Sequence, residues 1–533
     1  MVQTRLIKIA YILLLVLLAI FLSLNLLQYA NPMLYPPGRD GGAYMYGGRT
    51  VLHGQTLYVD YWEAKGPMII FINAFGLLLG GDSRWGVWLM EFLFWFFSVI
   101  LAVFTLKRQY NLASALFGTV TMMMIGKILV GAGNFSEEYS LLFTWVAVTS
   151  FFYGLRKPTA KVFPILIGSM FALNFFTRAN NIVTSGLLII IWLLGTLRKK
   201  EIKSLLKSAI LVFAGGCIVA IPISLYFLIQ GTFIDMINAS IVYNFSYSFG
   251  TQPDANNLNI IKSSFLPALS DIGFWMVFPL IGFAIALVQL IKRSFARQFD
   301  PISLLMVLIW PAEMLASSVS GRSYGHYFLL WLPAVAILSA AALNFGLGPI
   351  ERLLTNKTRP NWASVGLLFV VTALITLFSY SQLAQYGNAL AKLALRNTEE
   401  LTYIQPISAF IAENTDPDDL ILVWGGQTGL LFMANRHSST AYNFYPLYAN
   451  SRLGRRIQQD YFEDLQRNKP KLIVDASIHA PDSLPSIDPD SRAVQRLIYP
   501  IANNHAEVLE YINAHYGLIY ELDGYQVYQI FEP

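Results

Sequence analysis

Between two strongly apolar stretches lies a polar segment, Pro36–Met68, whose side chains could carry out acid–base and phosphate chemistry. It reads PPGRDGGAYMYGGRTVLHGQTLYVDYWEAKGPM. Asp40 stands between a rigid Pro-Pro pair and a Gly-Gly step, at the expected start of a short helix, Ala43–His53. A carboxylate there could cap the helix, act as a general base at the membrane surface, or do both.

Lys65 and Glu63 form a second reactive group in the same segment. Lys65 precedes Gly66-Pro67, and because proline is favoured at the first helical position, we expect a short helix over Met68–Leu79. The free N–H groups of a helix start attract anions, so this pattern predicts a phosphate held beside Lys65 at the level of the lipid headgroups. The alternative is an interfacial lysine whose ammonium simply reaches water.

The composition places these residues in an integral membrane protein. Hydrophobic residues make up 55% of 533 positions, charged residues make up 13%, and the mean hydropathy is +0.51. Soluble domains have about 25% charged residues. The single cysteine, Cys217, excludes an intrachain disulfide and a cysteine-based metal site, and six scattered histidines lack the spacing of zinc hydrolases.

Apolar runs of about 20 residues are long enough to cross a bilayer. We expect eleven such spans, and we interpret the first as a retained helix because no signal-peptide cleavage site follows it. The expected spans are 9–28, 84–106, 112–130, 139–155, 162–177, 181–197, 207–229, 271–291, 301–319, 326–345 and 362–381.

The loop charges predict the orientation. One set of loops carries 18 lysines and arginines and the alternate set carries 8. Because positive loops stay in the cytoplasm, we expect a multi-pass protein of the plasma (inner) membrane with a cytoplasmic N-terminus. The first loop, 30–83, then lies outside, and so do the loop 231–270 and the segment Ser320–His326.

A change of composition after Tyr380 predicts two domains, a transmembrane domain over 1–385 and an extracytoplasmic α/β domain over 386–533. Strand-like runs alternate there with helical patterns, and Asp523-Gly524 is typical of a type I′ hairpin turn. We expect strands at Leu420–Trp424, Leu472–Val474, Leu518–Glu521 and Gln526–Ile530, and helices at Tyr403–Asn414, Gln427–Ala434 and Glu507–Tyr516.

Further polar side chains fall on the expected outer level. Glu137 and Glu138 stand together at the start of a span, either as a solvated face or as a functional pair. Arg178 and Arg322 could bind phosphate through two oxygens. Glu91 and Glu313 lie within expected spans, where ionisable groups usually face a cavity.

The segments R-D-G-G-A-Y and Y-x-D-Y-W-E-A-K-G-P resemble the GT-C superfamily of polyprenyl-phosphate-sugar glycosyltransferases. The resemblance extends to the E-E pair, to G-R-S-Y-G-H-Y-F-L-L-W-L-P and to the final D-G-Y hairpin. It is greatest to the glycosyltransferase family 39 and 83 group, which includes protein O-mannosyltransferases, aminoarabinose transferases and RgtA/B/C/D-like enzymes. It implies an α-helical polytopic membrane protein of GT-C fold with about eleven transmembrane helices.

The resemblance also implies roles for individual residues. Asp40 matches the catalytic aspartate, Lys65 matches the lysine that meets the lipid phosphate, and Arg178 and Arg322 are further phosphate-binding candidates by location. The residues matched to acceptor or cation positioning are Glu63, Glu137, Glu138, Tyr44 and His326. The alanine between Glu63 and Lys65 departs from the aminoarabinose-transferase pattern.

The implied reaction transfers a sugar from a polyprenyl phosphate to a hydroxyl of a glycan, lipid or protein at the bilayer, with inversion. It requires no nucleotide or redox cofactor and no nucleic acid, and it leaves a divalent cation open. A transporter or flippase of lipid-linked sugars is the alternative, but no inverted repeat and no paired broken helices are found in the sequence. A membrane-anchored sugar-binding protein is the third reading, and the presence of Asp40 and Lys65 disfavours it.

Overall fold

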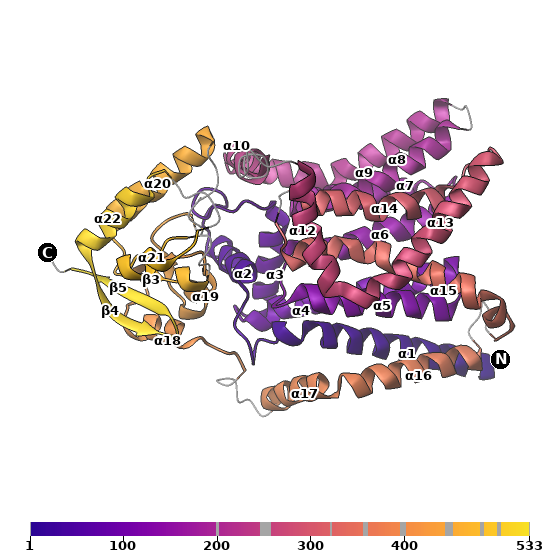
Figure 1. The fold of residues 1–533 in the computed structure, drawn as a ribbon, viewed down its shortest axis with the longest axis horizontal. Coiled ribbons are helices and arrows are strands. Elements are labelled where there is room, and N and C mark those ends of the chain that lie inside the picture. Colours follow the sequence, from indigo (N-terminus) through magenta and orange to yellow (C-terminus); the bar gives the residue numbers. More distant parts are fainter. Residues whose placement is uncertain are drawn as a thin grey trace. The chain divides into compact units, whose positions relative to one another are not determined.

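The computed structural model in Figure 1 shows a helical membrane protein that carries a small C-terminal sheet. It describes residues 2–198, 202–245, 257–319, 322–354, 361–394, 401–442, 451–479, 484–497 and 503–531. Outside the described residues lie Ser320, Gly321, residues 246–256 of the expected outer loop, and the loop cations Lys199, Lys200, Lys357 and Arg359.

The chain divides into two compact units. The first contains Met1–Asn31, Leu89–Ser224 and Asn257–Thr398, and the second contains Pro32–Trp88, Leu225–Asn256 and Glu399–Pro533. The second unit therefore combines the first loop, part of the expected loop 231–270 and the C-terminal sheet domain.

Long apolar helices build the first unit. They are α1 (Val2–Leu26), α4 (Arg84–Gln109), α5 (Leu112–Val130), α6 (Ser136–Arg156), α7 (Val162–Thr177), α8 (Val183–Leu197), α9 (Ile202–Ile229), α12 (Asn257–Ile272), α13 (Val277–Phe295), α14 (Pro301–Ser318), α15 (Leu332–Leu354), α16 (Trp362–Phe378) and α17 (Tyr380–Ala394), of which α4 and α9 continue into the second unit.

Each of the eleven expected spans coincides with a helix in this structure. Among the described residues, eight helices are long and apolar enough to cross a membrane, and α16 with α17 gives a ninth if that pair, bent by 78°, is one span. The expected spans 139–155 and 162–177, which correspond to α6 and α7, are not among these helices. The 16 residues of α7 extend only about 24 Å, which is short of a bilayer core.

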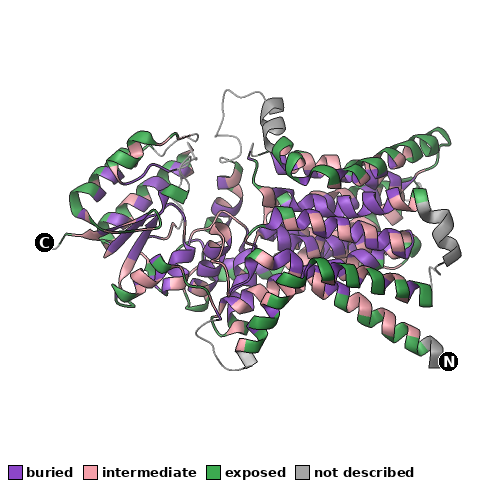
Figure 2. Cartoon of the chain, turned by 60° about the horizontal axis from the view of Figure 1, so that its bottom comes forward, coloured by how far each residue is buried: buried purple, intermediate pink, exposed green. Residues whose placement is uncertain are grey.

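Figure 2 shows buried residues in the middle of the helical bundle and exposed residues on the outward faces of its peripheral helices. The exposed residues there include large apolar side chains such as Phe213, Ile229 and Phe378. Because water would penalise such surfaces, these faces fit contact with lipid.

The C-terminal part of the second unit contains one five-stranded sheet in the order β2-β1-β3-β5-β4. The strands β1, β2 and β3 are parallel, and β5 pairs antiparallel with β3 and β4. Their bounds are β1 (Leu420–Trp424), β2 (His437–Ser438), β3 (Leu472–Asp475), β4 (Tyr516–Leu522) and β5 (Tyr525–Ile530). The helices are α18 (Pro406–Glu413), α19 (Gly429–Ala434), α20 (Arg452–Asn468), α21 (Pro489–Val494) and α22 (His505–His515).

The expected α/β pattern of this sheet domain is confirmed. The turn residues Asp523 and Gly524 have φ of 50° and 82°, as a type I′ hairpin requires. Helix α20 was not anticipated, although Ser451 caps it and its residues alternate between a charged and an apolar face.

The first loop folds as two short helices, α2 (Arg39–Leu52) and α3 (Pro67–Gly80). The expected start of α3 at a proline is confirmed. The expected start of α2 at Ala43 is wrong, because the helix begins four residues earlier and its N-cap is Gly38. Asp40 is therefore not the cap; it lies in the first turn, where the helix dipole favours its negative charge.

Helix α2 packs directly against α19 of the sheet domain. A β-carbon on Gly42 would lie 2.7 Å from the Cα of Gly429, so only glycine allows this approach. The backbone N–H of Ser438 donates to the Tyr46 hydroxyl (2.7 Å), and Arg49 donates to the carbonyl of Phe432 (2.6 Å). The sheet domain thus fixes the helix that carries Asp40.

We expect Gly42→Val to destabilise the protein, because the nearest atoms are backbone atoms that cannot move aside easily. Overpacking of this kind costs about 1–3 kcal/mol. The matched control is Gly387→Val in α17, where nothing lies within 4 Å of an added β-carbon. Thermal unfolding in detergent should show a lower midpoint for Gly42→Val than for the control, and equal midpoints would contradict the close packing.

Candidate active site

The loop between α2 and α3 folds back on itself around Tyr58. The backbone N–H of Tyr58 donates to the carbonyl of Tyr61 (2.7 Å), and Leu57 and Tyr61 form a short bridge. Tyr58 has φ of 72°, a left-handed conformation that is costly for a bulky residue. This turn buries the Tyr58 ring and places its hydroxyl 2.9 Å from the carbonyl oxygen of Lys65, to which it donates.

Asp40, Glu63 and Lys65, which the sequence predicted to act together, interact electrostatically in the structure. Burial raises the pKa of Glu63 to about 7; the Lys65 ammonium opposes this shift and the Asp40 carboxylate adds to it. A hydrogen bond also joins Lys65 to Glu63, because the backbone N–H of Lys65 donates to Glu63 Oε1 (3.1 Å).

Lys65 lies where an anion would be favoured. It is half-buried, and its ammonium forms no ion pair with any described residue. The next residue, Gly66, is the N-cap of α3 and has no side chain to satisfy the first N–H groups of that helix. Cation and helix start together form a place that suits a phosphate oxygen.

Tyrosines connect α2 to the Lys65 loop. The Tyr61 hydroxyl donates to the carbonyl of Ala43 (2.6 Å), and the rings of Tyr61 and Tyr46 lie 5.9 Å apart. Burial raises the pKa of Tyr61 well above its usual value, and the nearby carboxylates of Glu63 and Asp40 add to the shift. These tyrosines therefore stay protonated at neutral pH. The predicted site residue Tyr44 is buried in the same helix.

The predicted acids Glu137 and Glu138 lie in the first unit at the start of α6, and both are buried, so they are not a solvated face. Glu138 accepts from the backbone N–H of Phe135 (2.9 Å), the N-cap of α6, and from Trp95 Nε1 (2.8 Å). Glu137 pairs with Arg178. Different partners thus allow the two adjacent acids to be buried together.

The remaining predicted residues of the outer level also belong to the first unit. The Arg178 guanidinium lies over the ring of Tyr327, 4.1 Å from its centroid. The His326 ring stacks on the ring of Phe135, with centroids 4.1 Å apart. Arg322, four residues before His326 in the sequence, is buried. Arg178 and His326 are thus both held by aromatic rings.

The two acids within spans are hydrogen-bonded inside the protein. Glu91 accepts from the backbone N–H of Asn134, and Glu313 accepts from the backbone N–H (2.9 Å) and hydroxyl (2.6 Å) of Thr184. Gly133, with φ of 76°, allows the loop to approach Glu91. Each acid thus stabilises a local backbone.

The described residues contain no group of three or more His, Cys, Asp or Glu side chains arranged to hold a metal ion. The structure adds Tyr58 and Asn244 to the predicted residues around Lys65. The Asn244 side chain donates to the carbonyl of Ala64. No local motif marks Asn244, which is 180 residues away in sequence.

Comparisons with known proteins agree with the fold. No family model matches the chain, and no curated protein matches it by sequence. The structure is similar to ArnT from Cupriavidus metallidurans bound to undecaprenyl phosphate, with a TM-score of 0.58, 13% identity, and coverage of 95% of this chain and 97% of that one. It is also similar to the oligosaccharyltransferase AglB from Archaeoglobus fulgidus in complex with an inhibitory peptide and a dolichol-phosphate, with a TM-score of 0.54, 12% identity, and coverage of 98% and 74%. The chain thus shares the fold of these two membrane proteins, as the resemblance of its first-loop motifs implied.

Proposed function

We propose that the protein is an inverting glycosyltransferase of the membrane that moves a sugar from a polyprenyl phosphate to an acceptor hydroxyl. The observation that carries this proposal is the half-buried Lys65 beside the uncapped start of α3, with its backbone N–H bonded to Glu63, in a fold shared with ArnT bound to undecaprenyl phosphate. The acceptor is a glycan, lipid or protein of the cell envelope.

Lys65 is the proposed ligand of the donor phosphate. A polyprenyl phosphate leaves the anomeric carbon as an anion, so a fixed cation lowers the barrier as negative charge develops on the leaving group. Lys65 suits this role because its ammonium has no ion-pair partner among the described residues. Arg178 and Arg322 are proposed as further phosphate ligands.

Asp40 is the proposed general base. It lies in the first turn of α2, where the helix dipole favours its negative charge, and a carboxylate there can accept a proton from the acceptor hydroxyl. A single displacement by that hydroxyl inverts the anomeric carbon. Glu63 is proposed to orient the acceptor or a divalent cation. The other proposed acceptor-positioning residues are Tyr44, Glu137, Glu138 and His326.

The loop charges support an outer location for this reaction, with the N-terminus in the cytoplasm and residues 386–533 outside the plasma (inner) membrane. Two observations weigh against a transporter. The buried acids Glu91 and Glu313 bind backbone N–H groups of the protein, so they are poorly placed to relay protons. Asp40 and Lys65, the proposed base and phosphate ligand, lie in the first loop instead.

Lys65→Ala should weaken binding of undecaprenyl phosphate about 10–100-fold, because a charge-assisted contact contributes roughly 1.5–3 kcal/mol. Lys65→Arg keeps the charge and should lose less. Titration of both purified variants in detergent measures this difference. Unchanged affinity in Lys65→Ala would exclude the lysine as a phosphate ligand.

Asp40→Asn should lower turnover about 10²–10⁴-fold and leave donor binding intact, because an amide cannot take the proton. The cap of α2 is Gly38, so folding should survive the change. The control is Asp235→Asn, an exposed acid in the first turn of α10 (Phe233–Ile237). Sugar transfer from a labelled lipid donor reports turnover. A similar turnover in both variants would exclude Asp40 as the general base, and the role would then be assigned to Glu63 or to the Glu137-Glu138 pair.

Glu63 should make stability depend on pH. Its pKa is about 7 in the folded protein and about 4.5 when unfolded, so between these values the folded state holds the proton and the unfolded chain releases it. Stability therefore falls as pH rises from about 4.5 to about 7, and Glu63→Gln removes this loss. We expect the difference in melting midpoint, parent minus Glu63→Gln, to decrease as the pH is raised from 5 to 8. The control is Glu413→Gln, at an exposed position, for which the same difference should not change with pH. A difference that stays constant for Glu63→Gln would contradict the raised pKa.

A further inference from the structure

The segment that follows α9 approaches the Lys65 loop within the second unit. It consists of α10 and a π-helix, Asn238–Val242, which ends immediately before Tyr243 and Asn244. Single π-turns are rare and are frequent at functional sites, because the extra residue redirects the side chains that follow. Here the two side chains that follow meet the loop.

Asn244 holds the peptide bond between Ala64 and Lys65. Its Nδ2 donates to the carbonyl oxygen of Ala64 and also to the carbonyl of Ser240 (2.9 Å), so the amide is fixed at its own end. The N–H of that same 64–65 peptide donates to Glu63 Oε1. Both polar groups of the peptide plane are therefore bonded to side chains.

The next peptide plane is held in the same way. The carbonyl of Lys65 accepts from the Tyr58 hydroxyl, and the Tyr58 ring lies 5.5 Å from that of Phe227 at the end of α9. With a bond on each side, the backbone of Lys65 has little freedom to rotate. The direction in which its side chain leaves the loop is therefore set by Asn244 and Tyr58.

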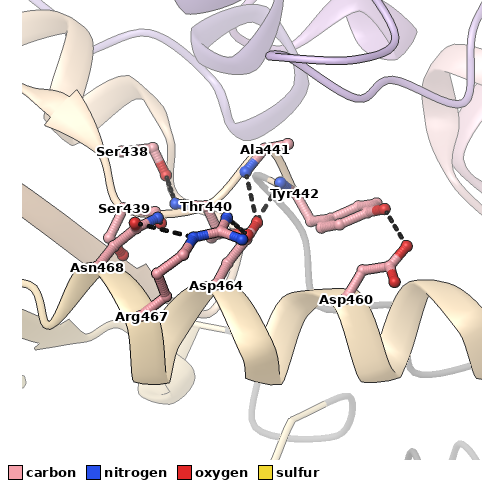
Figure 3. A network of polar contacts seen from close by, with 9 residues as sticks. All are labelled: Ser438, Ser439, Thr440, Ala441, Tyr442, Asp460, Asp464, Arg467 and Asn468. Carbon is pink, nitrogen blue, oxygen red and sulfur yellow. Dashed lines mark hydrogen bonds and ion pairs between the residues drawn. The ribbon is translucent and has the colours of Figure 1, made fainter.

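Aromatic packing supports the position of Asn244. The Trp62 ring packs edge-on against the Tyr243 ring, with centroids 4.8 Å apart, and its centroid lies 5.9 Å from that of Tyr442. The backbone N–H of Trp62 donates to the carbonyl of Ala441 (2.9 Å). The Tyr442 hydroxyl in turn donates to the Asp460 carboxylate of α20 (3.1 Å), a contact drawn in Figure 3. Asn244 thus reaches a loop that is already packed on two sides.

We propose that Asn244 is a positioning residue, which acts through Lys65 by fixing the 64–65 peptide plane so that the ammonium faces the donor phosphate. This inference rests on the proposed function of Lys65. Loss of the amide leaves the Ala64 carbonyl without this donor and lets the Lys65 backbone rotate, so the ammonium spends less time in the binding geometry.

The test is a double-mutant cycle of Asn244→Ala and Lys65→Ala, with the affinity for undecaprenyl phosphate as readout. Asn244→Ala alone should weaken binding about 3- to 10-fold, the weight of one hydrogen bond. In the Lys65→Ala background it should have no further effect. Asn238→Ala is the matched control, because that side chain makes no hydrogen bond to any described residue.

Two further variants separate positioning from packing. Asn244→Leu is close to asparagine in size and uncharged but removes the N–H donor, and it should behave like Asn244→Ala. Tyr58→Phe keeps the ring beside Phe227 and removes the other bond, so it should also weaken binding only when Lys65 is present.

If the affinity losses of Asn244→Ala and Lys65→Ala multiply in the double variant, Asn244 does not act through Lys65. The positioning role is also wrong if both Asn244 variants and Tyr58→Phe bind with parental affinity. In either case Lys65 remains a phosphate ligand. Parental affinity in Lys65→Ala would instead overturn the proposed function itself. The two failures are therefore distinguishable.

Discussion

Helix α2 carries the proposed base, and the close packing of its glycines is the constraint on which the candidate site depends. Four of its 14 residues are glycine, and each costs about 0.5–1 kcal/mol in a helix. Three of these glycines have neighbours that a β-carbon would overlap: Gly42 meets Gly429, Gly47 meets the ring of Tyr61, and Gly48 meets the backbone of Ala74. A short helix of this composition is stable only where tertiary contacts hold it.

The position of Asp40 therefore depends on parts of the chain far from it in sequence. Gly429 lies at the end of the segment Gly425–Gly429, which has the glycines of a phosphate loop without the spacing of one. Gly425 and Gly426 have φ of 120° and 70°, and they turn the chain from β1 into α19, which packs on α2. The glycines are explained by backbone geometry and close packing, so the sheet domain supports the site without supplying a reactive group.

The sequence predicted those parts that local chemistry determines. Pro67 marks the start of α3, and Asp523-Gly524 marks the last hairpin, because each needs a backbone geometry that few residues prefer. The early start of α2 was missed because two glycines follow Asp40 and look unlike a helix. The bond from Asn244 to Ala64 was missed because it depends on a π-helix and on folding across 180 residues. Charge alone could not show that Glu137 and Glu138 are buried with separate partners.

The ion pairs distinguish the cations proposed for the donor phosphate. Arg178 already neutralises the buried Glu137, and its guanidinium also lies on the ring of Tyr327. A phosphate would have to share it with a carboxylate, and removal of Arg178 would leave a buried charge unpaired, at a cost of about 3–5 kcal/mol. Lys65 has no such partner among the described residues and lies beside an open helix start. A lost Arg178 would therefore appear first as lost stability, whereas a lost Lys65 would appear as lost donor affinity.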